Sequence, residues 1–145
     1  MKKIIGSLVL LLILAGCQTS SQKVTTLCSY KEGPWNIEQT FTSKDDVLLI
    51  EDTNQTYQWV GYMTEEEINE ELVTLSELYS GIDGLTYTYD LNEEEVLETY
   101  YIDYTKATYE QLAGVGLLEE NDHPDAFASL EATIENLEAF GYECK

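Results

Sequence analysis

Three cysteines, one histidine and 28 acidic residues are the side chains of this 145-residue chain that are best suited to chemistry. Cys17 has the most informative surroundings, because it directly follows the small residues Ala15 and Gly16. An apolar run at residues 4–14 precedes them, and a lysine pair at residues 2–3 precedes the run. This order is typical of a secretory signal that ends at a cleavage site. The thiol of Cys17 is therefore a candidate for covalent modification after export.

The stretch Leu14-Ala15-Gly16-Cys17 resembles the lipobox of bacterial lipoproteins, in which the cysteine thiol receives a diacylglyceryl group and cleavage occurs just before it. As a helix the apolar run spans roughly 16 Å at ~1.5 Å per residue, about half of the roughly 30 Å of a hydrocarbon core. We therefore expect residues 1–16 to be removed as a signal peptide and Cys17 to carry two or more acyl chains such as palmitate. The alternative is an ordinary signal peptide with a cysteine there by chance.

Residues 17–24 comprise this cysteine and a polar stretch without periodicity, which predicts a lipidated N-terminus and a flexible tether. We expect residues 25–145 to form a single domain, since a chain of this length buries enough surface to fold without a metal. The signal predicts a position on the extracytoplasmic face of the cell membrane, and we expect a Gram-positive cell surface. A further hypothesis concerns the signal itself, because residues 7–16 resemble the apolar pheromone peptides released from some lipoprotein signals.

The chain is strongly acidic, with a formal net charge of −21 and no arginine. Removal of Lys2 and Lys3 with the signal takes the charge to −23. This charge argues against nucleic-acid binding, because few cations are present to neutralise phosphates. It also disfavours contact with an anionic bilayer beyond the lipid itself. We expect a soluble monomer whose acidic surface is either simply solvated or attracts cations or a basic partner.

Cys28 and Cys144 remain once Cys17 is assigned to the lipid, and they stand near the two ends of the folded region. Disulfides persist outside the cytoplasm, so we predict a Cys28–Cys144 bridge that closes nearly the whole domain as one loop. In the chain-entropy description such a bridge contributes about 3–5 kcal/mol to stability. Two buried free thiols are the alternative.

Alternation of apolar and polar residues predicts an antiparallel set of strands. The polar residues 52–55 interrupt one of them and predict a bulge or a break. A last short extended piece is predicted at residues 142–144. The main predicted strand segments are residues 25–30, 35–41, 47–50, 57–61, 85–91 and 96–104.

Helix starts are marked by capping residues. Thr64 and Glu67 have the spacing of a capping box, which predicts a helix over residues 65–80. Thr108 begins a second, short helix in the same way, and Pro124 suits the first turn of a last helix. The order β-β-β-α-β-β-α-α predicts an α+β fold, a two-layer sandwich with the helices on one face of a twisted antiparallel sheet.

Four stretches carry a family resemblance through their order and spacing: Lys44-Asp45-Asp46-Val47, Leu85-Thr86-Tyr87-Thr88-Tyr89, Ile102-Asp103 and Tyr109-Glu110-Gln111-Leu112-Ala113-Gly114-Val115. In these stretches the chain resembles the YehR-like family of small bacterial lipoproteins of unknown function. The resemblance implies an α+β fold on an antiparallel sheet, and it supplies no activity and no site residues. The extreme acidity and the Cys28 and Cys144 pair depart from the family pattern.

Catalytic patterns are weak in this chain. His123 stands at a predicted helix start without the partners that a catalytic or metal site needs, and no serine lies in a Gly-x-Ser-x-Gly elbow. With 28 acidic residues, carboxylate pairs suited to a glycosidase are expected by chance and are weak evidence for that activity. We therefore predict no catalytic residue, no cofactor and no dedicated metal site. A weak calcium site is the open alternative, on the acid clusters Asp45-Asp46, Glu51-Asp52 and Glu119-Glu120-Asn121-Asp122.

Eleven tyrosines and two tryptophans are the last candidates for a site. Aromatic residues favour strands, so they either pack beneath the helices or form a binding face. We expect Tyr62 and Tyr101 to be more exposed than the others. The aromatic residues singled out on predicted strands are Tyr57, Trp59, Tyr87, Tyr89, Tyr100 and Tyr104.

These observations favour a non-enzymatic, lipid-anchored domain that binds an unidentified envelope protein, peptide or other envelope component. The alternative is a carboxylate-dependent enzyme or a divalent-cation-binding accessory subunit of the envelope. A deep pocket with several convergent acids would favour that alternative.

Overall fold

The computed structural model describes residues 22–118 and 127–145. Its centre is a six-stranded antiparallel sheet with the strand order β4-β5-β3-β2-β1-β6. The chain builds it from hairpins, and the C-terminal strand returns to pair with the first one. The strands are β1 (Val24–Glu32), β2 (Trp35–Lys44), β3 (Val47–Gln58), β4 (Leu85–Leu91), β5 (Glu95–Asp103) and β6 (Glu143–Cys144).

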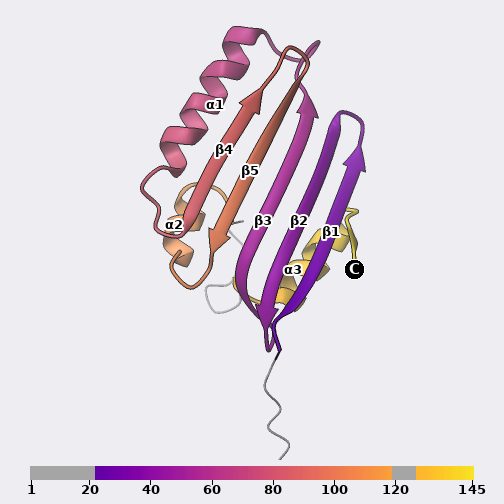
Figure 1. Ribbon diagram of the computed structural model, residues 1–145, viewed down its shortest axis with the longest axis vertical. Coiled ribbons are helices and arrows are strands. Elements are labelled where there is room, and N and C mark those ends of the chain that lie inside the picture. Colours follow the sequence, from indigo (N-terminus) through magenta and orange to yellow (C-terminus); the bar gives the residue numbers. More distant parts are fainter. Residues whose placement is uncertain (1–21, 119–126) are drawn as a thin grey trace, which may run out of the picture.

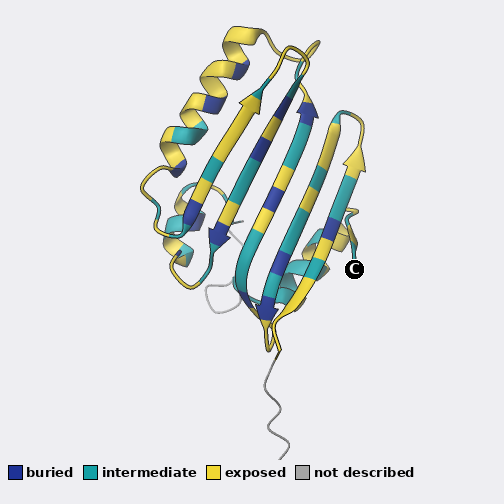
Figure 2. Ribbon diagram, in the orientation of Figure 1, coloured by how far each residue is buried: buried dark blue, intermediate teal, exposed yellow. Residues whose placement is uncertain are grey.

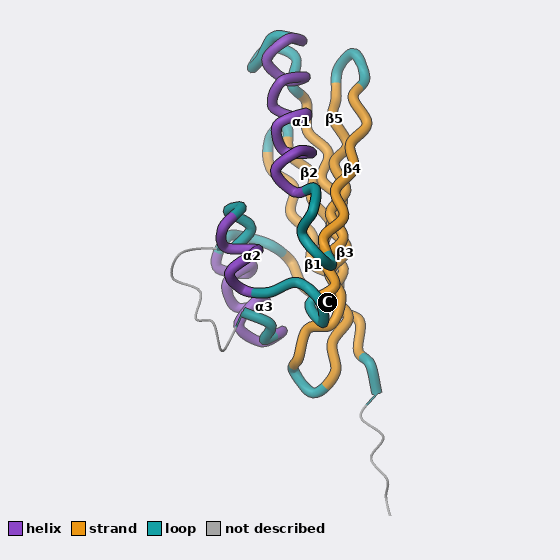
Figure 3. The backbone as a smooth tube through the Cα atoms, turned by 90° about the vertical axis from the view of Figure 1, so that its left-hand side faces the viewer, coloured by secondary structure: helices purple, strands orange, loops and turns teal. Residues whose placement is uncertain are grey.

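Three helices lie on one face of the sheet, and in the described part of the chain the other face carries none (Figure 1 and Figure 3). They are α1 (Glu65–Tyr79), α2 (Tyr109–Gly114) and α3 (Leu130–Ala139). Helix α1 runs beside β4, and α3 covers the lower part of β1 and β2 in the view of Figure 1. This arrangement confirms the predicted α+β sandwich and its element order, to which β6 adds the short extended piece at the C-terminus.

The two faces of the sheet differ in chemistry because side chains alternate along each strand. The face under the helices holds the buried residues, which appear as separate dark bands along the strands (Figure 2). The open face is polar, and one cross-strand row on it joins Thr88, Thr99, Asn54, Glu38 and Ser29. Covering this polar face with a helix would bury polar side chains and would add little stability.

The core consists of three small clusters, one beneath each helix. Under α1, Ile68 and Leu72 are fully buried against Val96. Burial of each such aliphatic side chain stabilises the fold by about 1.5–3 kcal/mol. The cluster at α2 centres on Leu112, and the cluster at α3 centres on Phe41.

Both predicted capping boxes are present. The Thr64 hydroxyl accepts a hydrogen bond from the Glu67 N–H at 3.3 Å, and the Glu67 carboxylate accepts one from the Thr64 N–H at 2.8 Å. Thr108 and Gln111 repeat this arrangement at the start of α2. The capping boxes are local in sequence, which is why sequence alone predicted both helix starts.

Helix α3 begins at Leu130, with Ser129 as its N-cap. Asp46, from the β2–β3 turn, accepts hydrogen bonds from the Ser129 hydroxyl and the Glu131 N–H, both at 2.8 Å. Pro124, His123 and the acids at 119–122 lie outside the described residues, as do Cys17 and the signal at residues 1–16. Across residues 22–118 and 127–145, no helix is long and apolar enough to cross a membrane.

The predicted break at residues 52–55 is wrong, because β3 continues through it with regular pairing. Asp52 and Asn54 face the open polar side, whereas Thr53 and Gln55 face the helices and donate hydrogen bonds to the half-buried Glu51 and the buried Glu98. Polar residues are therefore accommodated on both faces. The irregularity in pairing lies instead near the β2–β3 turn, where Thr42 pairs with Ile50 and Ser43 with Leu48, so that Leu49 of β3 is skipped.

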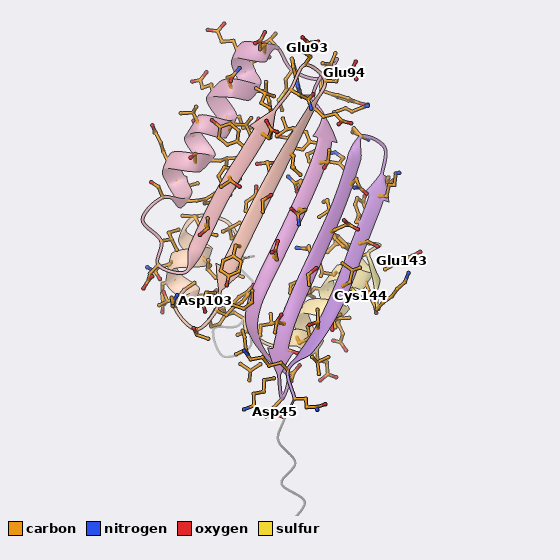
Figure 4. The ribbon with its side chains drawn as sticks, viewed as in Figure 1. Asp45, Glu93, Glu94, Asp103, Glu143 and Cys144 are labelled. Atoms are coloured by element: carbon orange, nitrogen blue, oxygen red, sulfur yellow. A yellow bond between two sulfur atoms is a disulfide. The ribbon has the colours of Figure 1, made fainter. Side chains whose placement is uncertain are left out.

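Cys28 and Cys144 form a disulfide across paired positions of β1 and β6. This is the pairing that the sequence predicts, and Cys28 is completely buried. Figure 4 shows Cys144 beside β1. Reciprocal backbone hydrogen bonds of 3.0 and 2.8 Å join Leu27 to Lys145 next to the bridge. The C-terminus is thereby fastened to the first strand.

Candidate functional site

Glu98 on β5 is a charged side chain buried beneath α1, only 2% exposed. Its Oε1 accepts hydrogen bonds from the hydroxyls of Tyr87 and Tyr100, the latter at 3.1 Å. Its Oε2 accepts one from Nε2 of Gln55 at 2.7 Å. Hydrogen bonds of this kind offset the cost of burying a carboxylate.

Four tyrosines surround this carboxylate, and the rings of Tyr79, Tyr87 and Tyr100 contact one another. The ring centroids of Tyr79 and Tyr87 are 5.2 Å apart, and those of Tyr87 and Tyr100 are 4.9 Å apart. Burial first, and then the neighbouring Glu98, raises the pKa of the hydroxyls of Tyr57, Tyr79, Tyr87 and Tyr100 above the ordinary value for tyrosine. The hydroxyls therefore stay protonated and remain hydrogen-bond donors.

We expect this cluster to make the domain sensitive to alkali. An unfolded tyrosine loses its proton near pH ~10, whereas a clustered tyrosine in the folded state keeps it, so the folded state binds more protons above that pH. The free energy of unfolding should stay level below about pH 9 and then fall by about 1.4 kcal/mol per pH unit for each such tyrosine. In urea titrations across this range, Tyr87→Phe should reduce the slope. Independent ionisation of all eleven tyrosines with the fold intact would contradict this expectation.

A second group of aromatic residues forms a pocket that is open to solvent. The cavity measures about 230 Å³ and lies between α1 and the sheet, where β2 begins and β3 ends. Trp35 is 40% exposed, Met63 38% and Tyr62 72%. We call it the aromatic pocket, and its lining residues are Pro34, Trp35, Tyr57, Gln58, Trp59, Tyr62, Met63 and Glu71.

The β1–β2 turn places the first ring of the pocket. Gly33 has a φ of 56°, a left-handed conformation that favours glycine, and Pro34 follows it. Trp35 then opens β2 directly opposite Tyr57 of β3. Their rings stack with centroids 4.5 Å apart.

The loop between β3 and α1 places the other rings. The carbonyl of Trp59 accepts hydrogen bonds from the N–H groups of Tyr62 and Met63, both at 3.1 Å. Nε1 of Trp59 donates to the carbonyl of Asn92 at 3.0 Å, which fixes the indole against the β4–β5 turn. The capping box at Thr64 then starts α1 and brings Glu71 to the pocket wall.

The surroundings of the aromatic pocket are acidic. Helix α1 has three glutamates in its first turn, Glu65 to Glu67. Trp59 also lines an adjoining open cleft, together with Glu65, Asp90 and Glu93. Figure 4 shows Glu93 and Glu94 at this end of the molecule. Among the described residues, no lysine lines either hollow.

The aromatic pocket lies at the far end of the sheet from the chain entry. Strand β1 starts at Val24 and ends at Glu32, next to the turn that carries Pro34. Nine residues of strand span about 30 Å. In Figure 1 the chain enters β1 at the lower end, and the β1–β2 turn and the start of α1 lie at the upper end. A tether attached before Val24 would therefore leave the pocket on the distal side.

Comparison with known proteins identifies the family. Residues 25–143 match the family described as a protein of unknown function, DUF1307. The chain belongs to the DUF1307 family. Residues 1–18 match the prokaryotic membrane lipoprotein lipid attachment site. The attachment site implies that this DUF1307 protein is anchored to a membrane through lipid.

Relatives of this DUF1307 chain are lipoproteins without an assigned function. The uncharacterized lipoprotein Lmo0207 of Listeria monocytogenes is 27% identical over 106 residues, which cover 72% of this chain and 69% of the relative. The uncharacterized lipoprotein Lin0239 of Listeria innocua is 32% identical over 75 residues, which cover 50% of this chain and 49% of the relative. These relatives confirm the resemblance to a family of lipoproteins of unknown function that the sequence predicted.

Two solved structures share the fold. The E. coli YehR protein, determined by NMR, has a TM-score of 0.71 at 19% identity, with 86% of this chain and 92% of that chain covered. An NMR structure of a protein from Streptococcus pneumoniae TIGR4 has a TM-score of 0.60 at 16% identity, with 100% and 98% covered. These matches agree with the α+β fold of the DUF1307 chain.

The predicted aromatic candidates divide between core and surface. Tyr57, Tyr87 and Tyr100 belong to the buried network around Glu98, while Tyr57 and Trp59 also line the pocket. The predicted exposure of Tyr62 and Tyr101 is confirmed, at 72% and 40%. Tyr101 lies on the open face, paired with Asp52, away from the helices. Some of the aromatic residues therefore pack beneath the helices, and others line a surface that is open to solvent.

Trp35 was a candidate only as one of the two tryptophans, and Met63 and Glu71 were not among the candidates predicted from sequence. The sequence placed Trp35 only in the predicted strand at residues 35–41. The turn signal at Lys44-Asp45-Asp46 was usable, because the β2–β3 hairpin closed there sets Trp35 opposite Tyr57. The position of Glu71 depends on how α1 packs against the sheet, which periodicity alone does not specify.

The acid clusters considered for calcium are not assembled into a metal site among residues 22–118 and 127–145. Asp46 caps α3 through both carboxylate oxygens. Glu51 and Asp52 are consecutive strand residues and point to opposite faces. In the described part of the chain, no group of three or more histidine, cysteine or acidic residues could hold a metal ion. The third cluster, at 119–122, lies outside the described residues.

Glu51 lines a second cleft, of about 210 Å³, between the sheet and α3. Its carboxylate accepts hydrogen bonds from the hydroxyls of Tyr104 at 2.6 Å and Thr53 at 2.8 Å, and from Nε2 of Gln39 at 3.2 Å. Gln39 also lines the cleft, and its buried Oε1 has no hydrogen-bond partner within the described residues. A single carboxylate already held by several donors is poorly placed for acid–base chemistry.

Proposed function

We propose that this DUF1307 protein is a lipid-anchored, non-enzymatic binding domain that uses the aromatic pocket to hold an envelope component. In this proposal residues 1–16 are removed, Cys17 carries the lipid and residues 17–24 form the tether. Residues 25–145 then form a monomeric domain on the extracytoplasmic face of the membrane, at a Gram-positive cell surface. The lipid attachment site and the lipoprotein relatives support this placement.

The observation that carries the proposal is the contiguous exposed apolar surface of the aromatic pocket. Trp35, Tyr62 and Met63 leave much of their side-chain area in water at one place. Covering apolar area stabilises a complex by about 25 cal/mol per Å². Exposed patches of contiguous apolar residues on soluble domains commonly mark interaction sites. The distal position of the pocket leaves it accessible to an envelope partner.

The carboxylates of the helix-covered face support binding rather than catalysis. Glu98 is held by three donors beneath α1, and Glu51 by three donors beside α3. A general acid or base needs an oxygen that can reach a substrate proton. The aromatic pocket itself has one carboxylate, Glu71, in its lining.

A photocrosslinking experiment on intact cells tests the proposal. A photoreactive phenylalanine analogue replaces Tyr62 at the pocket, or Tyr101 on the open face as the matched control. We expect a discrete adduct, identified by mass spectrometry, from position 62 and none from position 101. The adduct should disappear when Trp35→Ala is added. No adduct at position 62, or the same adduct at both positions, would refute a binding role for the pocket.

A further inference from the structure

The lining of the aromatic pocket indicates the chemistry of its ligand. It combines four aromatic rings, from Trp35, Tyr57, Trp59 and Tyr62, with one acidic side chain, Glu71. Building on the proposed function, we propose that the pocket binds an alkylated ammonium group, such as the trimethylammonium head of a choline-type ligand. The proposal concerns the class of the ligand and goes beyond the binding role itself.

The aromatic rings favour a cation over a neutral apolar group. The face of an aromatic ring carries partial negative charge and attracts a cation within about 6 Å, and tryptophan is the strongest of the side chains in this respect. Trp35 and Tyr57 stack with centroids 4.5 Å apart, and Trp59 is held in place by its hydrogen bond to Asn92. A set of fixed rings around one cavity of about 230 Å³ suits a compact cation.

The charge around the pocket favours a cation for an independent reason. Glu71 is near the rings: burial raises the pKa of Tyr57, and after burial the carboxylates of Glu98 and Glu71 raise it further. The neighbouring cleft adds Glu65, Asp90 and Glu93 on the other side of Trp59. The chain as a whole has a formal charge of −21. These charges attract cations toward this end of the domain and repel anions.

The scarcity of hydrogen-bond acceptors favours an alkylated ammonium over a primary one. A primary ammonium has three N–H donors, and each donor left unpaired after burial costs about 1–3 kcal/mol. In the pocket lining, Glu71 and Gln58 are the two polar side chains besides the tyrosine hydroxyl groups. A trimethylammonium group has no N–H donor, so its methyl groups contact the rings while its charge faces Glu71 without any loss of hydrogen bonds.

Intrinsic fluorescence can test this inference directly, because both tryptophans of the chain line the pocket. The mature lipidated protein, residues 17–145, is placed in phosphatidylglycerol vesicles, which contain no choline. Choline is then titrated at constant ionic strength, in parallel with its uncharged isostere 3,3-dimethylbutanol. We expect saturable quenching by choline in the millimolar range, at least about tenfold tighter than the response to the isostere, as a cation–π contribution of this size predicts.

Two acidic positions on α1 provide a matched pair of variants. Glu71→Gln removes the charge from the pocket wall and should weaken choline binding about tenfold, with little change for the isostere. Glu70→Gln makes the same change in net charge at a residue outside the pocket lining, and it should bind choline like the unchanged protein. Circular dichroism before titration confirms that both variants are folded.

The outcomes separate the ligand class from the binding role. Equal affinity for choline and the isostere would overturn the ammonium inference and leave an apolar binding pocket intact. An equal loss of choline affinity in Glu71→Gln and Glu70→Gln would show only a general attraction between the acidic surface and the cation. That result would also overturn the ammonium inference. The absence of any saturable fluorescence response to choline would likewise overturn the ammonium inference. Crosslinking at position 62 decides separately whether the pocket has a partner. Methylammonium binding as tight as choline would refute the preference for the alkylated form.

Discussion

The Glu98→Ala variant should lose about 3–5 kcal/mol of its free energy of unfolding. Removal of the carboxylate leaves the hydroxyls of Tyr87 and Tyr100 and the amide of Gln55 without their acceptor, in a partly buried region beneath α1. The deleted side chain also leaves a cavity beneath α1, which adds to the loss. Urea denaturation followed by circular dichroism measures the change.

Two further variants separate the hydrogen-bond network from the loss of volume and charge. Glu98→Gln keeps the volume and one carbonyl acceptor, so it should cost only about 1 kcal/mol. Glu38→Ala removes a glutamate from the open face of β2, where it is exposed, and should change stability by less than about 0.5 kcal/mol. A Glu98→Ala loss as small as that of Glu38→Ala would contradict a structural role for the buried carboxylate.

Glu98 also shows where sequence analysis reaches its limit. Alternation along β5 places Val96, Tyr100 and Ile102 on one face, and Glu98 occupies the same face, where an apolar residue would be expected. Two of its three donors come from other strands, with Gln55 43 positions away in sequence and Tyr87 11 positions away. A buried charge becomes acceptable only when the sheet register supplies such donors, and register is a non-local property. The wrongly predicted break at residues 52–55 has the same cause.

Local features were predicted with greater success. The capping boxes at Thr64 and Thr108 depend on residues three positions apart, and both are present. The general α+β order follows from periodicity in single segments. The aromatic pocket was missed as a unit because Trp35, Tyr57 and Glu71 come from β2, β3 and α1. Their meeting depends on one hairpin turn and on how one helix is placed.

Removal of the Cys28–Cys144 bridge should cost about 4–5 kcal/mol, because it closes a loop with a sequence separation of 116 residues. A small domain has a total stability of about 5–15 kcal/mol, so the Cys28→Ser, Cys144→Ser double variant should be only marginally folded. Urea denaturation of this variant against the oxidised protein measures the difference. Intact mass with and without reductant verifies the bridge, and two titratable thiols in the native protein would refute it.

Two explanations for such a loss make different predictions. If the bridge acts mainly on the unfolded chain, its removal lets that chain expand, and the dependence of the unfolding free energy on urea should become steeper. If the bridge acts mainly by fastening β6, then Tyr142→Ala should reproduce much of the loss, because Tyr142 stacks on Tyr30 with centroids 5.0 Å apart. We expect the first result, with Tyr142→Ala costing about 1–2 kcal/mol. Strand β6 is only two residues long, so fastening it contributes little. Most of the stabilisation must come from restricting the conformations of the unfolded chain.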